Sequence, residues 1–351
     1  MRVGKTMTET NMNATELCHI DRIQGLLNTV RGTPVLVLGD LLLDAYVYGR
    51  TERVSREAPV PIMVANKKKF APGGAANAAA VAASLGGSVH AAGFLGDDEN
   101  GRALLTTLLD GGVKLAHAPL GNMVTATKTR YLAGSLGTPY QQVLRVDHSL
   151  QADAAILKSV HDECTQALNT AHAQGVKAVL ISDYGSGATH DILLSLANTA
   201  NDLGFAVLVD SRYGVSDYKL TNGILKPNAI ELETAVGAHD LSEDAILLEA
   251  AQTLRSNTNA KAVLATKGKN GMVWCDERCT VATSSLPNPV DSIDVTGAGD
   301  GVAAAALLGL ANDFTPEDIL ALATLTATFI VSQHGTACPT SDDLATLAKT
   351  Y

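Results

Sequence analysis

A short glycine-rich segment near the carboxyl end of the chain combines the residue types that phosphoryl transfer needs. It reads Asp294-Val-Thr-Gly-Ala-Gly-Asp300 and leads into an Ala-rich run. Glycines let backbone N–H groups come close to a ligand, and the amino terminus of a helix favours an anion. Asp300, at the start of the predicted helix, could accept a proton from an attacking hydroxyl. A base beside an anion-binding turn is a sensible minimum for phosphoryl transfer, which depends on positioning and electrostatics.

Two other interpretations of this segment stay open when it is taken alone. The glycine spacing in Gly297–Gly301 superficially resembles a dinucleotide-binding turn, although it lies late in the chain and no convincing apolar strand directly precedes it. The second alternative is a structural glycine turn with an aspartate cap. A standard P-loop is excluded, because the sequence contains no G-x-x-x-x-G-K-[ST] motif.

The elements that would position this segment alternate between short apolar runs and helical patterns, which is typical of buried parallel strands joined by helices. The strand candidates are Val35–Leu38, Val89–Phe94, Ala178–Ile181, Ala206–Val209 and Ala262–Ala265. The helix candidates are Ala75–Leu85, Asn100–Asp110, Asp153–Ala173, Asp191–Leu203, Ser242–Arg255, Ala298–Asn312 and Pro316–Gln333. This order predicts an α/β fold with a mostly parallel central sheet and helices on both faces.

Two segments interrupt this alternation. Residues 45–70 and 125–146 alternate polar with apolar side chains and contain no long helical stripe. Both segments predict antiparallel strands outside the main sheet, in positions that suit a small β-sheet lid over the active cleft. We therefore expect one domain over residues 31–351, with lid segments at about 45–72 and 125–146, preceded by an N-terminal tail and a leading helix in residues 1–30.

The composition restricts the classes of partner. Lys and Arg total 26 against 36 Asp and Glu, and aromatic residues make up only 4% of the chain, so we expect no nucleic acid. Five scattered cysteines predict free thiols in a reducing compartment. No run approaches the roughly 20 apolar residues of a membrane span, and the polar residues 1–19 lack the apolar core of a signal peptide. We expect a loose tail there and a cytoplasmic protein without a membrane partner.

The glycine-rich segment resembles the C-terminal signature of the ribokinase-like (PfkB) sugar kinases. A second motif, Pro72-Gly-Gly-Ala-Ala-Asn-Ala-Ala-Ala80, is similar to the N-terminal signature of the same family. The two occur in the family's order, and the likeness extends from about Val35 to Cys338. The resemblance implies a ribokinase-like three-layer sandwich with a small β-sheet lid. It also implies ATP-dependent phosphorylation of a sugar or sugar phosphate.

The resemblance assigns roles to individual residues. It implies that Asp300 is the general base that deprotonates the acceptor hydroxyl, while the amides of Gly297, Ala298 and Gly299 stabilise the transferring phosphate. The residues that it implies for sugar binding are Asp44, Gly73, Gly74 and Asn77. Glycines let the backbone approach a ring, and Asp and Asn side chains bind its hydroxyls. The alternative for Gly73–Ala80 is a well-packed helix start.

Two further motifs resemble the nucleotide site of the family. Pro227-Asn-Ala-Ile-Glu231 implies Asn228 beside the ATP phosphates and Glu231 as the residue that holds Mg²⁺ through water. Taken alone, these two residues also fit a helix cap with an acid in the first turn. The matches to the nucleotide loop are Thr266, Gly268 and Gly271, for which a β-turn is the alternative. Activation by K⁺ through backbone oxygens near Asp294 is a further family trait.

One stretch is more specific. Arg53-Val-Ser-Arg-Glu-Ala-Pro-Val-Pro-Ile62 resembles an element of bacterial D-glycero-D-manno-heptose 7-phosphate kinases, which make heptose 1,7-bisphosphate. Gln141–Asp147 and Lys128–Arg130 are similar to lid strands of those enzymes. A phosphorylated substrate needs fixed cations, and the candidates are Arg53, Lys128, Arg130 and Arg145. Each of them could instead be a solvated strand residue.

Several features depart from the heptose kinase pattern. Asp210-Ser-Arg-Tyr213 stands where D-P-K is usual, which removes a lysine, and Gly301 replaces a Thr after Asp300. The sequence ends at Tyr351, so we expect no second, nucleotidyltransferase domain. Ribose, fructose or a fructose phosphate are alternative substrates. A catalytically silent regulatory relative and an NAD-linked oxidoreductase are alternatives of other classes. The resemblance also implies a homodimer through the lid.

Overall fold

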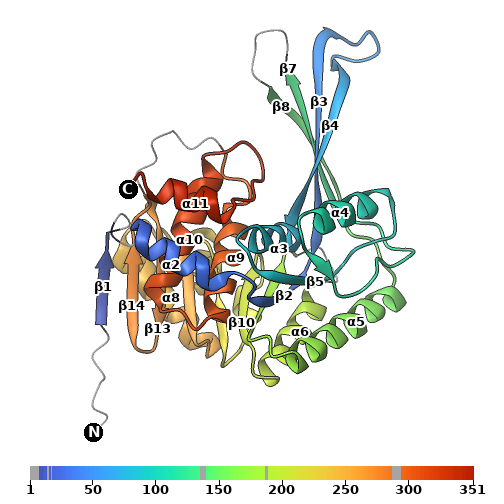
Figure 1. Ribbon diagram of the computed structural model, residues 1–351. Helices are drawn as coiled ribbons and strands as arrows, with labels where there is room; N and C mark the ends of the chain where they lie inside the picture. Colours follow the sequence, from blue (N-terminus) through green and yellow to red (C-terminus); the bar gives the residue numbers. More distant parts are fainter. Residues whose placement is uncertain (1–7, 14–15, 17, 135–139, 186–188, 287–293) are drawn as a thin grey trace.

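The computed structural model describes residues 8–13, 16, 18–134, 140–185, 189–286 and 294–351 (Figure 1). Within these ranges, ten strands form one sheet in the order β1-β14-β13-β12-β11-β10-β9-β2-β5-β6. All neighbours are parallel except β12–β13 and β13–β14. In sheet order the strands are β1 (Thr8–Met12), β14 (Cys279–Thr283), β13 (Met272–Asp276), β12 (Ala262–Thr266), β11 (Gly223–Leu225), β10 (Ala206–Ser211), β9 (Ala178–Asp183), β2 (Pro34–Gly39), β5 (Ser88–Gly93) and β6 (Lys114–Leu115).

Helices cover both faces of this sheet, and each face has its own hydrophobic core. Side chains alternate along β2, so Val35 and Val37 pack into one core while Leu36 and Leu38 pack into the other. The first core holds α2 (Ile20–Val30), α3 (Ala75–Ser84), α4 (Glu99–Asp110), α9 (Ala298–Ala311), α10 (Pro316–Val331) and α11 (Ser341–Ala348). The second holds α5 (Ala154–Ala173), α6 (Thr189–Asp202), α7 (Ala229–Val236) and α8 (Asp244–Thr258). The predicted three-layer α/β fold is confirmed.

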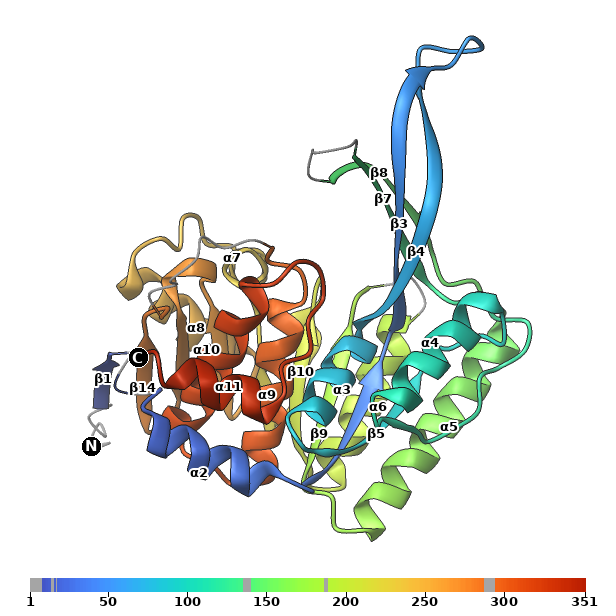
Figure 2. The ribbon, with the colours of Figure 1, turned by 45° about the horizontal axis from the view of Figure 1, so that its top comes forward.

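A second sheet rises away from this body (Figure 2). Its order is β4-β3-β7-β8, and we call these four strands the arm. They are β3 (Leu41–Val54), β4 (Pro61–Gly74), β7 (Thr127–Gly134) and β8 (Gln141–His148). The predicted strands outside the main sheet are therefore present. The expectation of an antiparallel sheet is wrong for the central pair, because β3 and β7 start two different hairpins that leave the body in the same direction and so pair in parallel.

The N-terminal segment differs from its prediction. The sequence predicts a loose tail through residue 19, but β1 pairs in parallel with β14, and Thr8 lies opposite Cys279. An edge strand of a sheet offers unpaired backbone groups, and these can order a polar segment that has no apolar pattern of its own. No helix within the described ranges is both long and apolar enough to span a bilayer.

Candidate active site

The predicted catalytic segment lies at the carboxyl ends of the central parallel strands, where α/β sheets commonly bind ligands. Asp40 follows β2, Tyr184 follows β9, Asp210 lies near the end of β10, and Lys226 follows β11. The amino-terminal turn of α9 brings Asp300 to the same place. Side chains from five separate parts of the chain therefore meet at one edge of the sheet.

Asp300 is a buried carboxylate with two neutral donors. Its side chain accepts a hydrogen bond from Asn77 Nδ2 at 2.7 Å and one from the Tyr184 hydroxyl at 2.5 Å. Only 5% of the residue is exposed. Burial raises the pKa of Asp300 to about 6, although both hydrogen bonds and the nearby Lys226 ammonium favour the ionised form. A carboxylate with a pKa near neutrality is suited to general-base chemistry.

The GG-x-x-N motif lies beside Asp300, because Asn77 donates a hydrogen bond to that carboxylate. Gly74 precedes α3 with φ +57°, and a side chain there would come within 2.8 Å of the Asp40 carbonyl oxygen. A side chain at Gly73 would come within 3.1 Å of the Asp44 carboxylate. Asn77, in the first turn of α3, is fully buried, and its amide oxygen has no hydrogen-bond partner within the described residues. That oxygen is a ready acceptor for a ligand hydroxyl.

The turn before α9 has the form of an anion site. Gly297 has φ +82°, and a side chain there would come within 2.8 Å of Asn77 Nδ2. Gly299 lies in the first helical turn, close to the ammonium of Lys226. The Ala298 amide already donates a 3.3 Å bond to the Val295 carbonyl, so it is less available than its predicted role requires.

Asp294 holds the other end of this turn. Its carboxylate accepts bonds from the backbone and hydroxyl of Thr296, at 2.9 and 2.7 Å, and from the Gly335 amide at 3.0 Å. These bonds tie the turn to the segment after α10. The preceding residues, 287–293, lie outside the described ranges.

Lys226 is a cation fixed next to the anion turn. It is 3% exposed and pairs with Asp210 at 3.0 Å. Burial opposes its charge, but Asp210 and Glu231 raise the pKa of Lys226, so it stays protonated. A buried ammonium at the amino end of α9 would attract a phosphate group.

The predicted nucleotide motif forms a helix cap. Asn228 Oδ1 accepts the Glu231 amide at 2.9 Å, and Glu231 Oε2 accepts the Asn228 amide at 2.8 Å. The pKa of Glu231 is raised, because the effect of burial outweighs the Asn228 hydrogen bond and the Lys226 ammonium, which lower it. Among the described residues, no group of three or more His, Cys, Asp or Glu side chains could hold a metal ion. Within the part of the chain that the structure describes, Glu231 therefore belongs to no ready-made cluster of such ligands.

The second nucleotide motif lies beside the first. The Thr266 amide donates to the Pro227 carbonyl at 3.0 Å, so the ends of β12 and β11 are joined. Gly268 begins a short 3₁₀ turn with φ +56°, and Gly271 ends it with φ +92°. A side chain at Gly271 would come within 1.9 Å of the Thr283 carbonyl oxygen. These residues therefore form a turn between β12 and β13, and the turn adjoins Asn228.

A cavity of about 250 Å³ separates the base of the arm from the body. Lys128, Arg145 and Arg212 all line it, together with Tyr184. The Lys128 ammonium lies 4.9 Å from the centre of the Tyr184 ring, and the Arg212 guanidinium lies 5.6 Å from it. Burial lowers the pKa of Lys128. Arg212 and Arg145 lower it further, and Asp44 raises it only in part. We call this the cation pocket.

The structure separates the four predicted cations. Lys128 and Arg145 line the cation pocket, although Arg145 pairs with Asp147 at 2.5 Å. Arg130 is instead paired with Asp44 at 2.7 Å, and both side chains are largely buried. The Arg130 guanidinium is thus held against Asp44, and it is not among the residues that line the cation pocket.

Arg53 does not reach the site. It lies nine residues beyond Asp44 on β3, which at about 3.3 Å per residue places it about 30 Å away. The expectation that Arg53 lines the same site as Asp44 is therefore wrong within one chain, because β3 leads it out along the arm.

The sequence motifs do not predict several residues of the site, which are Tyr184, Asp210, Arg212 and Lys226. Each is a polar residue at or just after the end of a buried strand, and none was assigned a site role from its motif. Their signal is position, because Tyr184 and Arg212 come just past the predicted strands Ala178–Ile181 and Ala206–Val209. Asp210-Ser-Arg-Tyr213 lacks the lysine of the D-P-K pattern, and Arg212 of this segment supplies a cation to the pocket.

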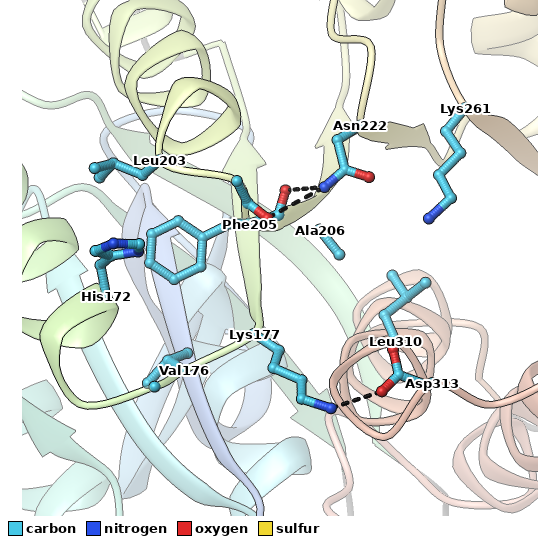
Figure 3. Close-up of a pocket in the computed structure, with 12 residues that line it drawn as sticks. His172, Val176, Lys177, Leu203, Phe205, Ala206, Asn222, Lys261, Leu310 and Asp313 are labelled. Atoms are coloured by element: carbon cyan, nitrogen blue, oxygen red, sulfur yellow. Dashed lines mark hydrogen bonds and ion pairs between the residues drawn. The ribbon is translucent and has the colours of Figure 1, made fainter.

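A larger cavity, about 370 Å³, lies at the opposite edge of the sheet (Figure 3). His172 packs edge-to-face on Phe205 there, and Lys177 pairs with Asp313 at 2.6 Å. The carboxyl ends of α5, α6 and α9 surround this cavity. Lysines at such ends complement the helix dipoles, so a structural role accounts for them.

Comparisons with known proteins agree with this geometry. The model of the pfkB family of carbohydrate kinases matches residues 33–343. The bifunctional protein HldE of Caulobacter sp. (strain K31) is 36% identical over 338 residues, which cover 93% of this chain and 65% of that protein. This chain thus spans about two thirds of the length of that relative.

Solved structures share the fold. Phosphofructokinase-2 from Escherichia coli, in complex with substrates and products, has a TM-score of 0.72 at 22% identity, over 91% of this chain and 99% of that one. Ribokinase from Arabidopsis thaliana, complexed with ribose and ATP, has a TM-score of 0.68 at 20% identity, with the same coverage.

Proposed function

Because the chain belongs to the pfkB family of carbohydrate kinases, we propose that it transfers a phosphoryl group from ATP to a hydroxyl of a sugar phosphate, with heptose 7-phosphate as the first candidate substrate. The family makes it a sugar or sugar-phosphate kinase. The product of the candidate reaction is heptose 1,7-bisphosphate.

The observation that carries this proposal is the environment of Asp300. A buried carboxylate with a pKa of about 6 lies at the amino end of α9, beside a glycine turn and the Lys226 ammonium. Asp300 would take the proton of the sugar hydroxyl, and the resulting oxygen would attack the γ-phosphorus while ADP leaves. The amides of the turn, Gly299 among them, and Lys226 would stabilise the charge that develops on the transferring group.

The acceptor sugar would lie between α3 and the base of the arm. Asp44, held by Arg130, and the unpaired amide oxygen of Asn77 are fixed acceptors for its hydroxyls. Gly73 has no side chain that could displace the Asp44 carboxylate, and Gly74 lets the backbone pass close to the Asp40 carbonyl oxygen.

The nucleotide would lie toward α7 and the Thr266–Gly271 turn. In this proposal Asn228 approaches the phosphates and Glu231 holds Mg²⁺ through water. The magnesium ion, when bound, neutralises phosphate charge. A K⁺ ion near Asp294 is the remaining cofactor candidate.

The cation pocket supports a phosphorylated substrate. Lys128, Arg212 and Arg145 converge there, and Asp147 offsets only part of their charge. Cations held together without matching anions favour an anionic ligand. Heptose 7-phosphate comes first because residues 53–62 resemble heptose kinases and because the HldE relative has 36% identity.

We also propose a homodimer formed through the arm. Val54, Val64 and Leu144 are among the apolar arm residues that are more than half exposed. Exposed apolar surface of this kind marks interaction sites. In such a dimer Arg53 could act only at the partner's site, because its own lies about 30 Å away.

A sugar panel tests the function. ADP release is measured with heptose 7-phosphate, fructose 6-phosphate, ribose and fructose, for the native chain and for Asp300→Asn. The proposal expects fastest turnover with a sugar phosphate and at least about a 100-fold loss in the variant. Absence of turnover on every sugar, with Asp300→Asn indistinguishable from the native chain, would refute the kinase.

A further inference from the structure

Tyr184 places its phenol directly on the carboxylate of the proposed base. The Tyr184 hydroxyl lies 2.5 Å from Asp300 Oδ1, opposite the bond that Asn77 makes to Oδ2. The backbone of this residue is also fixed, because its amide donates to Asp40 at 2.8 Å and the next amide, of Gly185, donates to Asp183 at 2.9 Å. The phenol is therefore held at a defined place.

The surroundings of the ring keep the phenol a proton donor. Burial raises the pKa of Tyr184 well above its ordinary value, and the charge of Asp300 raises it further, so the hydroxyl stays protonated. Lys128 and Arg212 lie over the ring at 4.9 and 5.6 Å. Cations over an aromatic ring draw on its electron density, which makes the attached O–H a stronger donor.

Two charged groups near Asp300 act on its pKa in opposite directions. Asp210, from β10, disfavours a second negative charge, while Lys226, after β11, favours it; these two are already paired at 3.0 Å. Cys338, from the segment after α10, is an exposed free cysteine and supplies no cation to this site. The hydrogen bonds from Tyr184 and Asn77 lower the pKa of Asp300 more than Lys226 does, and they favour the ionised carboxylate against its burial.

We propose that Tyr184 is a positioning residue of the kinase reaction, whose hydroxyl keeps Asp300 ionised and fixes the direction of its carboxylate toward the acceptor hydroxyl. This inference rests on the proposed function. A carboxylate oxygen accepts more than one hydrogen bond, so Oδ1 can receive the substrate hydroxyl while Tyr184 stays in place.

The kinetic test compares Tyr184→Phe with the native chain across pH. Loss of the donor makes the carboxylate harder to ionise, so the acidic limb of kcat/KM should move to higher pH. The loss should be about tenfold at pH 6 and much smaller at pH 8.5. Tyr140→Phe is the matched control, because Tyr140 is 49% exposed and does not line the cation pocket. A limb that stays at the native pH in Tyr184→Phe, or a loss equal at every pH, would overturn the proposal.

A second measurement does not depend on turnover. The carboxyl carbon of Asp300 is titrated by ¹³C NMR in the substrate-free native chain and in Tyr184→Phe, with Asp300→Asn for assignment. The proposal expects a higher midpoint in Tyr184→Phe. With 3-fluorotyrosine at position 184, a better donor, it expects a lower one. An unchanged midpoint in both folded variants contradicts the role of Tyr184, whereas failure on every sugar contradicts the proposed function alone.

Discussion

At the scale of single residues, the site depends on how burial and hydrogen bonds compete at Asp300. Burial alone would keep this carboxyl protonated, and a fully solvated carboxylate would be a weak base. Donors on both oxygens bring its pKa to about 6. The group is then mostly ionised at neutral pH and still basic enough to take a proton.

This balance predicts the pH dependence of the native enzyme. Because only ionised Asp300 can act as a base, kcat/KM should fall as pH drops through about 6 and level off above it. ADP release at low sugar concentration, followed from pH 5 to 8 at constant ionic strength, measures this limb. A limb near pH 4, the ordinary range of a solvated aspartate, would contradict the burial of the base.

The cation pocket gives a second prediction at this scale. Replacing Lys128 and Arg212 together with Ala should raise the KM of a sugar phosphate about 100-fold, because two charge-assisted contacts are lost. The KM of the unphosphorylated sugar should change far less. Lys67→Ala with Lys68→Ala is the matched control, since both lysines are exposed on β4. Equal increases in the KM of the sugar phosphate and of the unphosphorylated sugar would contradict a role of the cation pocket in phosphate binding.

His190 gives a prediction about stability. Its ring nitrogens contact Asp183 at 2.7 Å and Asp217 at 3.1 Å. Burial lowers the pKa of His190, but the two carboxylates outweigh this effect and raise it above 6.5. Its stabilisation is therefore complete below about pH 6.5 and is lost as pH rises through the higher, folded-state pKa.

Urea unfolding of the native chain and His190→Gln measures this effect. The difference between their free energies of unfolding should be larger at pH 6 than at pH 9. A difference that is constant with pH would show that the imidazole acts without a charge.

The sequence motifs identify some of these site residues and miss others. Asp300, Asn77 and the glycines are found because they belong to contiguous motifs, and the structure brings them together. Tyr184, Arg212 and Lys226 reach the site only because β9, β10 and β11 are parallel neighbours that end together. Arg53 shows the reverse, since its motif is distinctive but strand length takes it away from Asp44.

At the scale of elements, the ends of β2 and β5 show how closely the sheet is built beneath the site. Gly39 and Gly93 are register partners, with φ +154° and +152°. A side chain at Gly93 would come within 2.0 Å of the Gly39 carbonyl oxygen. These strand ends therefore require glycine on both sides.

Gly93→Ala should destabilise the protein by about 3 kcal/mol, through this backbone collision together with the strained φ. Gly112→Ala, at φ +81° with no atom within 4 Å, should cost only about 1 kcal/mol, from strain alone. Chemical denaturation of both variants gives the two values. Equal costs would show that the collision is relieved by movement of β2.

The predicted helices and central strands correspond closely to the observed ones, because their apolar patterns are long and continuous. β1 and β11 lack such a pattern and are ordered by the strands beside them. The parallel pairing of β3 with β7 cannot be predicted from the sequence of either strand, because it depends on the direction in which the two hairpins leave the body. Pairing across the arm is a tertiary property.

At the scale of the whole molecule, the arm carries the prediction of a dimer. Val143→Asp with Leu144→Asp places charges on two exposed apolar positions of β8 and should shift the chain toward a monomer. Light scattering coupled to size-exclusion chromatography measures the mass of both forms. Leu109→Asp, an exposed apolar position on α4, is the control and should leave the mass unchanged. A native chain that is monomeric at micromolar concentration would contradict the dimer.

The central place of β2 has a consequence for the synthesis of the protein. β2 pairs with β5, close behind it in the chain, and with β9, whose Val179 lies opposite Leu36. The ribosome releases the chain from its amino end, so more than a hundred residues are made between β2 and β9, which pairs with one edge of β2. The separation between Asn77 and Asp300 is larger still. Such distant pairings are formed slowly. The nascent chain therefore has an unpaired edge on the hydrophobic strand β2 until β9 emerges, and its catalytic centre can form only after Asp300 has been made.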